Sequence, residues 1–456
     1  MIVMKFGGTS VESAAAIERV ASIVKERLER RPVVVVSAMG KTTNTLLGIA
    51  NDSIAGRRAE TLAALEELRG FHLREARAAI LDSDWPEAQG IIDQHFAELT
   101  ELVKGLGVLG ELSPRSVDAI SSYGERLSSA IVALAFRKSG IRTAHVDSRQ
   151  VILTDARHTQ AAPIYSVTYE RLARTIPPLA RSGVVVMGGF IGSTQAGVTS
   201  TLGRGGSDFS ASIVGAGIGA EEIQIWTDVD GMLTADPTIL PGGHRVKSIS
   251  FVEAAELAYF GAKVLHPATV LPAIEKSIPV LILNSRRPEV PGTRIIAEAV
   301  HCTNAIKSIA CKRKIAVVNI HSTRMLMAHG FLRRIFEVFD RYQTPVDVVS
   351  TSEVSVSLTI DNTSRLEDIC RELREFAEVD VDEDLAIVCL VGENIRETPR
   401  VAARAFGATG GANIRMISQG ASRLNLTFVV AEQDLARVVQ SLHAEFFSKL
   451  DPAVFE

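Results

Sequence analysis

The chain has 456 residues, of which 46% are hydrophobic and 22% are charged, and its formal net charge at pH 7 is -4. This balance provides no basic surface for nucleic acid, and no apolar run approaches the roughly 18 residues that cross a bilayer. The composition is typical of a soluble protein of two or three domains. We therefore expect neither a nucleic-acid partner nor a membrane partner.

The ends of the chain and its cysteines predict a cytoplasmic location. Met1 leads directly into an apolar segment, without the basic and apolar leader of a secreted protein. The cysteines lie in the last third of the sequence and form no close pair of the metal-binding or redox type. They are Cys302, Cys311, Cys370 and Cys389.

The first ten residues place a cation and two glycines where a strand gives way to a helix. An apolar strand at 2–4 is followed by KFGGTS at 5–10. Glycines let backbone N–H groups approach an anion, and Lys5 adds a full positive charge. The helix cap is either Thr9 with Glu12 or Ser10 with Ser13. The segment predicts a phosphate site, although a purely structural turn is equally common for such a pattern.

Up to about residue 300, short apolar runs alternate with helical patterns. The runs at 33–36, 184–187, 223–226 and 280–283 are bounded by polar or glycine turns. This alternation predicts an α/β domain with a mainly parallel, buried sheet. Residues 51–112 are almost wholly helical, which indicates an insertion that covers one edge of the sheet.

The last third of the chain contains an internal repeat. A strand, a helix and two strands at 315–320, 331–342, 346–350 and 354–360 recur at 385–390, 401–406, 414–418 and 424–430. We therefore expect two small α+β modules, at 310–380 and 381–456, with approximate boundaries and interleaving allowed. Such appended modules are more often regulatory or oligomeric than catalytic.

A second glycine-rich segment, LGRGGSD at 202–208, precedes a helix of small residues. It is either a flexible loop capped by Ser207 or Asp208, or a second anion site that carries Arg204 and Asp208. Together with Lys5, it suits a ligand with several phosphates and an anionic acceptor.

Glu125 lies on a predicted helix, on a face of small, uncharged residues rather than on the apolar stripe. An ordinary solvated face carries more charge. Glu125 is therefore either an exposed glutamate or, if that face is buried, a receptor for a substrate ammonium.

The chain resembles the aspartate kinases of the amino-acid kinase family, nearly from end to end, and in particular the lysine-sensitive monofunctional members. Several motifs in the family order carry the resemblance. They lie at 5–10, 123–125, 189–192, 202–208, 226–231 and 260–267, and TSEVSV at 351–356 adds the likeness to lysine-sensitive members. The implied fold is an amino-acid kinase domain at 1–300, a mainly parallel sheet between helical layers, followed by two ACT modules.

The resemblance implies ATP- and Mg²⁺-dependent phosphorylation of the side chain of L-aspartate, the first step towards lysine, threonine and methionine. It assigns catalysis to Lys5 and Asp208. Aspartate binding falls to Thr43, Glu125, Arg204 and Ser207, whereas the implied nucleotide contacts are Lys5, Gly7, Gly8, Ser10, Thr227, Asp228, Leu233, Lys263 and Val264. Leu233 and Thr238 stand where some relatives have Tyr and Arg, so the adenine contacts stay open. No residue is assigned as a protein ligand to a metal.

The resemblance also implies feedback inhibition by lysine and assembly into a homodimer or larger oligomer through the ACT modules. The implied lysine site comprises Met325, Gly330, Phe331, Leu332, Val346, Asp347, Ser352 and Glu353, with Ala328 in place of a serine. Asp347 is expected to bind the inhibitor ammonium; without the resemblance it would be an exposed carboxylate at a strand end. Two rival functions are another amino-acid kinase, for acetylglutamate or glutamate, and a catalytically inactive amino-acid sensor.

Overall fold

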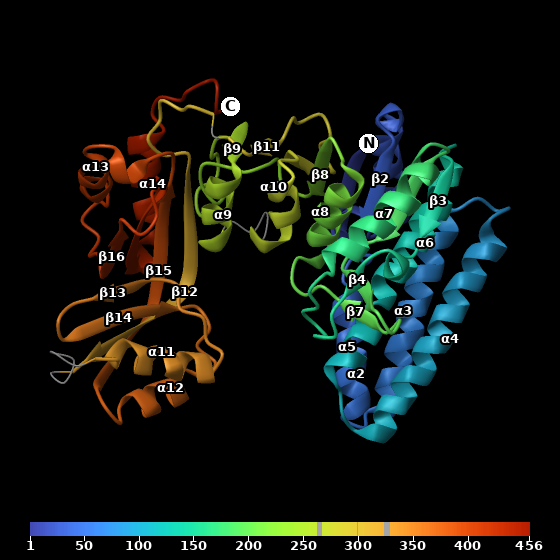
Figure 1. The fold of residues 1–456 in the computed structure, drawn as a ribbon, viewed down its shortest axis with the longest axis horizontal. Helices are drawn as coiled ribbons and strands as arrows, with labels where there is room; N and C mark the ends of the chain where they lie inside the picture. Colours follow the sequence, from blue (N-terminus) through green and yellow to red (C-terminus); the bar gives the residue numbers. More distant parts are fainter. Residues whose placement is uncertain (262–266, 299, 323–328) are drawn as a thin grey trace. The chain divides into compact units, whose positions relative to one another are not determined.

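A computed structural model describes residues 1–261, 267–298, 300–322 and 329–456. The chain forms two compact units, Met1–Gly231 with Leu265–Ala297, and Met232–Val264 with Glu298–Glu456 (Figure 1). The sequence placed the boundary near residue 300. The structure associates residues 232–264 with the C-terminal unit instead, because this segment pairs with it, for example through the hydrogen bond from Ile309 N to Thr234 O.

The first unit is built on a mainly parallel sheet, as the sequence predicted. The strands pair in the order β3-β5-β2-β1-β8-β10-β11, and among these described pairs only β10 and β11 run antiparallel. β1, β2 and β5 are buried along their whole length, since helices cover both faces. The strands are β1 (Ile2–Phe6), β2 (Pro32–Val36), β3 (Thr143–Val146), β5 (Val184–Gly188), β8 (Glu222–Thr227), β10 (Val280–Asn284) and β11 (Thr293–Ile296). A small second sheet joins β4 (Leu153–Thr154), β6 (Ile191–Thr194) and β7 (Thr199–Thr201).

Helices cover the two faces of this sheet. They are α1 (Ala14–Lys25), α2 (Thr42–Ile54), α3 (Arg58–Ala79), α4 (Trp85–Leu109), α5 (Pro114–Ser121), α6 (Tyr123–Lys138), α7 (Tyr165–Ala180), α8 (Gly206–Ile218) and α10 (Leu271–Glu275). Met4 of β1 shares a core with Leu65 of α3 and Phe96 of α4, so the predicted helical insertion packs into the domain. On the other face, a Cβ at Gly215 of α8 would lie 2.6 Å from Ile223 Cδ1. None of the described helices is both long and apolar enough to cross a membrane.

The first glycine turn differs from its prediction. β1 continues to Phe6, and Gly8–Ser10 form a 3₁₀ turn before α1 begins at Ala14. The cap is Ser13, whose hydroxyl accepts from Ala16 N at 3.2 Å. Both predicted caps are therefore wrong, because the chain makes an additional turn before the helix starts.

The second unit contains one antiparallel sheet in the order β13-β14-β12-β15-β17-β16. The strands of the unit are β9 (Ser248–Ser250), β12 (Ser308–His321), β13 (Val349–Thr351), β14 (Ser355–Ile360), β15 (Glu378–Val391), β16 (Met416–Gln419) and β17 (Asn425–Ala431). Its helices are α9 (Phe251–Tyr259), α11 (Phe331–Arg341), α12 (Leu366–Leu373), α13 (Val401–Gly407) and α14 (Leu435–Phe446).

Two long strands join the repeated modules. β12 and β15 have 14 residues each and pair along most of their length (Figure 1). The C-terminal part of β12 pairs with the start of β15, and its residues 308–312 pair with residues 387–391. The repeats therefore interleave within one sheet. The predicted strands at 315–320 and 385–390 are only parts of these longer strands.

Candidate active site

A cavity of about 350 Å³ in the first unit collects all the residues predicted for catalysis and aspartate binding. It lies where β1, β2 and β5 end, the edge at which parallel sheets bind ligands. Its lining is Lys5, Gly8, Ser37, Ala38, Gly40, Thr43, Glu125, Phe190, Gly203, Arg204, Gly205, Gly206, Ser207 and Asp208. The fold thus brings together segments that are up to two hundred residues apart.

Lys5 and Asp208 form an ion pair in this cavity, with 2.6 Å between Lys5 Nζ and Asp208 Oδ1. Lys5 lies near the end of β1, and Asp208 lies in the first turn of α8. Both side chains are largely shielded from water, with exposed fractions of 11% and 16%. The pair fixes an ammonium group at the edge of the sheet, beside the positive end of the α8 dipole.

Glu125 is buried, so the exposed alternative is wrong. Its residue exposure is 4%, and its Oε1 accepts a hydrogen bond from Ala38 N at 3.1 Å. Oε2 is buried and has no hydrogen-bond partner among the described residues. Burial raises the pKa of Glu125 to about 8, against the opposing effects of the Ala38 N–H and Lys5. A buried polar oxygen without a partner is uncommon in folded proteins, which makes Glu125 a candidate for contact with a ligand.

Two glycines permit the close backbone contacts around this cavity. A Cβ at Gly8 would lie 2.9 Å from Ala38 O, and one at Gly189 would lie 2.7 Å from Ser207 Cβ. Any larger residue at either position would push apart the backbone segments that line the cavity. α8 begins at Gly206 with Gly205 as its N-cap residue, so the alternative of a loop capped by Ser207 or Asp208 is wrong. Arg204, between two glycines with positive φ, stays exposed along the cavity wall.

Four of the predicted nucleotide residues lie beside the cavity lining rather than in it. Gly7 N donates to Trp226 O at 3.2 Å, which commits this N–H group to the sheet. Ser10 Oγ lies 2.8 Å from Ser285 Oγ. Thr227 and Asp228 share a side-chain hydrogen bond of 3.2 Å at the end of β8. Because β1 and β8 are adjacent, these residues occupy the same edge of the sheet as the cavity.

Among the other predicted nucleotide residues, Lys5 and Gly8 line the cavity and Leu233 does not. Leu233 belongs to the second unit, where its carbonyl accepts from Ser308 Oγ at 2.7 Å. Lys263 and Val264 lie outside the described residues, as does His266.

Phe190 is a cavity residue that the sequence prediction did not assign. It follows β5 with φ of 64°, a conformation that side chains rarely adopt. Its N–H donates to Ser210 Oγ at 2.9 Å, and a Cβ at Gly206 would lie 2.7 Å from its ring. The signal in the sequence was an aromatic residue between Gly189 and Ile191 at a strand end, but its strained backbone is visible only in the structure.

In the second unit, Asp347 already has a cation partner. Lys312 Nζ lies 2.9 Å from both Asp347 oxygens and 2.7 Å from Asp361 Oδ2. The Asp347 side chain is 4% exposed and precedes β13, so the alternative of an exposed strand-end carboxylate is wrong. Burial raises the pKa of Asp347, whereas the hydrogen bonds from Lys312 oppose the rise.

The remaining residues of the implied lysine site have varied environments. Gly330 has φ of 83° and is the N-cap residue of α11, whose first residue, Phe331, is buried. Val346 is half-buried. Leu332, Ser352 and Glu353 are exposed, and Met325 and Ala328 lie outside the described residues.

Comparisons with known proteins agree with this architecture. Residues 1–284 match the model of the amino acid kinase family, and residues 388–446 match an ACT domain. Aspartokinase 1, chloroplastic, of Arabidopsis thaliana is 38% identical over 98% of this chain and 80% of its own length. Lysine-sensitive aspartokinase 3 of Escherichia coli is 36% identical over 98% of this chain and 99% of its own.

Solved structures show the same fold. The crystal structure of E. coli aspartokinase III in complex with aspartate and ADP matches with a TM-score of 0.84 and 35% identity, over 98% of this chain and 100% of that chain. The structure of the same enzyme in complex with lysine and aspartate gives 0.85, again with 35% identity, over 98% and 99%. The chain belongs to the amino acid kinase family and, within it, to the aspartokinases.

Proposed function

We propose that this chain transfers the terminal phosphoryl group of ATP to the side-chain carboxylate of L-aspartate, giving 4-phospho-L-aspartate and ADP. The observation that carries the proposal is the single cavity lined by Lys5, Glu125, Arg204 and Asp208 at the carboxyl edge of a parallel sheet. Its groups match an acceptor with one ammonium and two carboxylates beside a polyphosphate. The complex of the E. coli relative with aspartate and ADP supports the same pair of ligands.

The acceptor amino acid is bound by charge complementarity. The buried Glu125 Oε2, which has no partner among the described residues, receives the ammonium. Arg204 is exposed along the cavity wall and binds the α-carboxylate, since a guanidinium pairs with a carboxylate through two hydrogen bonds. Thr43 and Ser207 supply hydroxyl groups at the same wall. These contacts leave the side-chain carboxylate free to react.

The transfer needs positioning and charge neutralisation rather than a strong base. An oxygen of the aspartate side chain forms a bond to the γ-phosphorus as the bond from that phosphorus to the bridging oxygen of ADP breaks. The carboxylate is already ionised at neutral pH, so no proton has to be removed. Lys5 neutralises charge on the phosphoryl oxygens, and Asp208 holds the Lys5 ammonium 2.6 Å away.

The side chains of the cavity also suit a Mg²⁺ ion that binds together with ATP. No group of three or more His, Cys, Asp and Glu side chains in the described part of the chain is arranged to hold a metal by itself. Mg²⁺ commonly uses one or two carboxylates together with substrate phosphates and waters, and Asp208 offers such a carboxylate in the cavity. When bound, the ion adds positive charge at the phosphates.

The nucleotide contacts are proposed along the same edge of the sheet. Gly8 lines the cavity, while Gly7, Ser10, Thr227 and Asp228 border it at the ends of β1 and β8. Leu233, Lys263 and Val264 remain predictions of the family resemblance.

We assign regulation by lysine to the interleaved C-terminal modules, with Asp347 as the partner of the effector ammonium. The E. coli relative is described as lysine-sensitive, and one of its structures contains lysine. Assembly into a homodimer or larger oligomer through these modules is part of the proposal. A cytoplasmic location stays a prediction, since the relatives include chloroplast enzymes.

The proposal is tested by ATP-dependent hydroxamate formation with Mg²⁺, comparing aspartate with glutamate and acetylglutamate, each with and without lysine or threonine. Turnover of aspartate that lysine suppresses is the expected result. Preference for another acceptor would contradict the assignment of Glu125 and Arg204. If no acceptor is turned over but lysine still binds, the chain is an amino-acid sensor and the catalytic proposal is wrong.

A further inference from the structure

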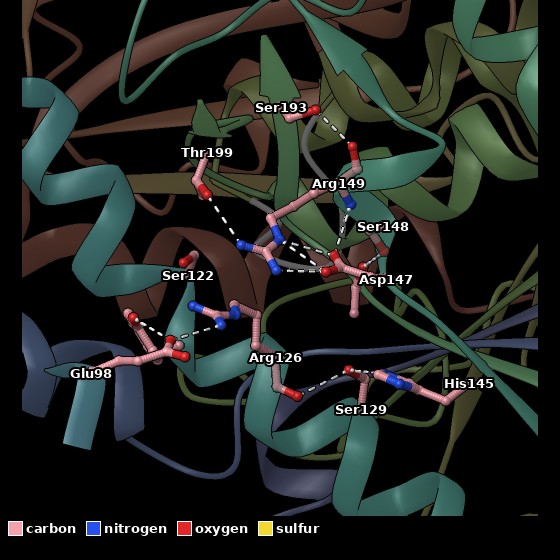
Figure 2. A network of polar contacts seen from close by, with 12 residues as sticks. Glu98, Ser122, Arg126, Ser129, His145, Asp147, Ser148, Arg149, Ser193 and Thr199 are labelled. Atoms are coloured by element: carbon pink, nitrogen blue, oxygen red, sulfur yellow. Dashed lines mark hydrogen bonds and ion pairs between the residues drawn. The ribbon is translucent and has the colours of Figure 1, made fainter. Parts of the chain in front are cut away.

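A second cavity, of about 230 Å³, lies beside α6 in the first unit and shares no lining residue with the proposed active site. Its charged and titratable lining residues come from two helices, one strand and the turn after that strand. They are His95 of α4, Arg126 of α6, His145 of β3, and Asp147 and Arg149 in the turn after β3. Figure 2 labels Arg126, His145, Asp147 and Arg149 among these residues. The proposed phosphoryl transfer uses none of these groups.

Two guanidinium groups dominate the cavity, and Figure 2 shows them turned toward the same space. Arg149 Nε lies 3.0 Å from both oxygens of Asp147, and Arg149 Nη1 reaches Thr199 Oγ1 at 3.4 Å. Arg126 lies over the Tyr123 ring at 4.1 Å and 3.3 Å from Glu98 Oε2. Two arginines that meet at one cavity are typical of a site for a carboxylate or another oxyanion.

Two histidines also line the cavity. His95 Nδ1 lies 2.7 Å from the Ile91 carbonyl, so Nδ1 carries the proton and Nε2 is left for a ligand. His145 Nε2 lies 3.0 Å from Ser129 Oγ. Burial, followed by Arg126, lowers the pKa of His95, against the opposing effects of the Ile91 carbonyl and Glu98. The pKa of His145 is also lowered, by removal of water and against the effect of Asp147.

The charges around the cavity are balanced. Glu98 and Asp147 offset Arg126 and Arg149, while the histidines are neutral at pH 7. Glu98 is 41% exposed and also accepts hydrogen bonds from Tyr123 Oη at 3.0 Å and Gln94 Nε2 at 3.1 Å, so an entering anion competes with it for Arg126. Ile91, Ala130 and Ile191 form an apolar wall, and Ser129, Ser148 and Gly188 complete the lining. Because this wall is apolar, it suits a ligand with a short hydrocarbon body better than a wholly polar phosphate.

We propose that this cavity binds a small organic carboxylate, with the carboxylate group between Arg126 and Arg149 and the hydrocarbon part against Ile91 and Ile191. The site is separate from the aspartate cavity, but residues of its lining lie next to Glu125. Arg126 follows Glu125 in α6, and Gly188, which lines the second cavity, has a Cβ position 3.0 Å from Glu125 O. The proposal does not depend on the phosphoryl-transfer chemistry.

Isothermal titration calorimetry tests the site in the full chain, with saturating aspartate present to fill the first cavity. Isobutyrate is the probe, isobutyramide its uncharged counterpart, and inorganic phosphate the polar alternative. We expect isobutyrate to bind, the amide not to bind and phosphate to bind at least tenfold more weakly. Equal or tighter binding of phosphate would overturn the assignment to organic carboxylates.

Matched variants of α6 locate the binding. Arg126→Gln should weaken isobutyrate binding at least tenfold. Arg137→Gln, near the other end of the helix and paired with Glu87 at 2.9 Å, should change it less than twofold. Unchanged binding by Arg126→Gln, or no binding to the wild-type chain at about 50 mM probe, would overturn the proposal.

The pH dependence supplies an independent readout. The carboxylate of the probe stays ionised between pH 6 and pH 8, and it favours protonation of the histidines. Glu98 also favours protonation of His95, as Asp147 does for His145, whereas Arg126 and Arg149 oppose protonation of His95. Binding should therefore tighten as the pH falls from 8 to 6, with proton uptake that His95→Asn reduces. Proton release on binding would contradict the site.

Discussion

Each unit of this protein buries a carboxylate, and the two differ in whether the carboxylate has a cation partner. Glu125 of the first unit has one oxygen without a hydrogen-bond partner among the described residues, and its pKa is raised to about 8. Asp347 of the second unit binds Lys312 through both oxygens, at 2.9 Å each. The first carboxylate is prepared for an ammonium from outside, whereas the second is already occupied by an ammonium of the chain itself.

Because of this difference, we expect the two ligands to bind at different free-energy costs. An aspartate ammonium that reaches Glu125 relieves an unfavourable burial, because it gives an unsatisfied oxygen its partner. A lysine ammonium that reaches Asp347 must first displace Lys312, and its apparent affinity is lowered by that competition. On the proposed assignments, the acceptor therefore supplies a missing partner, whereas the effector has to compete with a partner that is already bound.

The largest expected effect comes from removing the cation of the catalytic cavity. Lys5→Ala should lower kcat about 10³-fold, equivalent to about 4 kcal/mol of transition-state stabilisation, because the transferring phosphoryl loses its fixed positive charge. Steady-state hydroxamate assays measure it. Lys25→Ala, at the exposed end of α1, is the control and should retain wild-type turnover. Lysine binding should persist in Lys5→Ala, since the second unit is unchanged.

Glu125→Gln tests the proposed role of Glu125, because it replaces the carboxyl group with a neutral amide. We expect KM for aspartate to rise about thirty- to a hundredfold, because a neutral amide replaces a charged partner of the ammonium. Glu101→Gln, on the exposed face of α4 and 2.8 Å from Lys104, should leave KM within twofold. A KM that is equal in the two variants would show that Glu125 does not bind the acceptor.

The raised pKa of Glu125 also sets a pH dependence. Below about pH 8 the free site holds a protonated carboxyl, and an incoming ammonium must drive the proton off. KM for aspartate should therefore rise by up to about tenfold per pH unit as the pH is lowered from 8 to 6.5, and Glu125→Gln should flatten the profile. A flat profile for the wild-type enzyme would contradict the buried, proton-bound state.

The raised pKa of Glu125 also predicts how the free energy of unfolding changes with pH. Between about pH 4.5, where an unfolded glutamate ionises, and about pH 8, the native state binds more protons than the unfolded state. The contribution of Glu125 to the free energy of unfolding therefore falls as the pH rises through this range. At pH 8.5, Glu125→Gln should be more stable than wild type by about 1–3 kcal/mol in chemical denaturation, and the gain should shrink towards pH 5.

The smallest effect on turnover is expected from the second unit. Lys312→Met frees Asp347 and should lower the half-inhibitory concentration of lysine about tenfold, with kcat unchanged. Lysine should also raise the melting temperature more than in wild type, because Asp347 is left buried without its cationic partner. Lys314→Met, exposed two residues further along, is the control. Loss of inhibition in Lys312→Met would mean that Lys312 belongs to the effector site instead of competing for it.

Several features could be predicted because the sequence carries them locally. The buried strands of the first unit are continuous apolar runs, and Lys5, Arg204 and Asp208 stand within glycine-rich turns that suggest an anion site without any structure. The helix cap at Ser13 was missed because the 3₁₀ turn at Gly8–Ser10 adds residues that no periodic pattern marks.

Partners that are distant in the sequence could not be predicted. Lys312 and Asp347 are 35 residues apart, on a strand and in the loop before another. Residues 308–312 of β12 pair with the second repeat, across the predicted module boundary. Nothing in the local pattern marks either pairing, because each is set by how strands align in the finished sheet.

The class of fold, the family and the residue types of the proposed catalytic site follow from the amino-acid sequence, because hydrophobic period, glycine placement and motif order are local properties of the chain. The burial of those residues and the charged groups that surround them depend on the tertiary structure. It buries Glu125 with a free oxygen, places Lys312 on Asp347, and brings Arg126 and Arg149 to one cavity. Burial and charge pairing depend on which distant segments exclude water from a group, and that is settled only when the chain has packed.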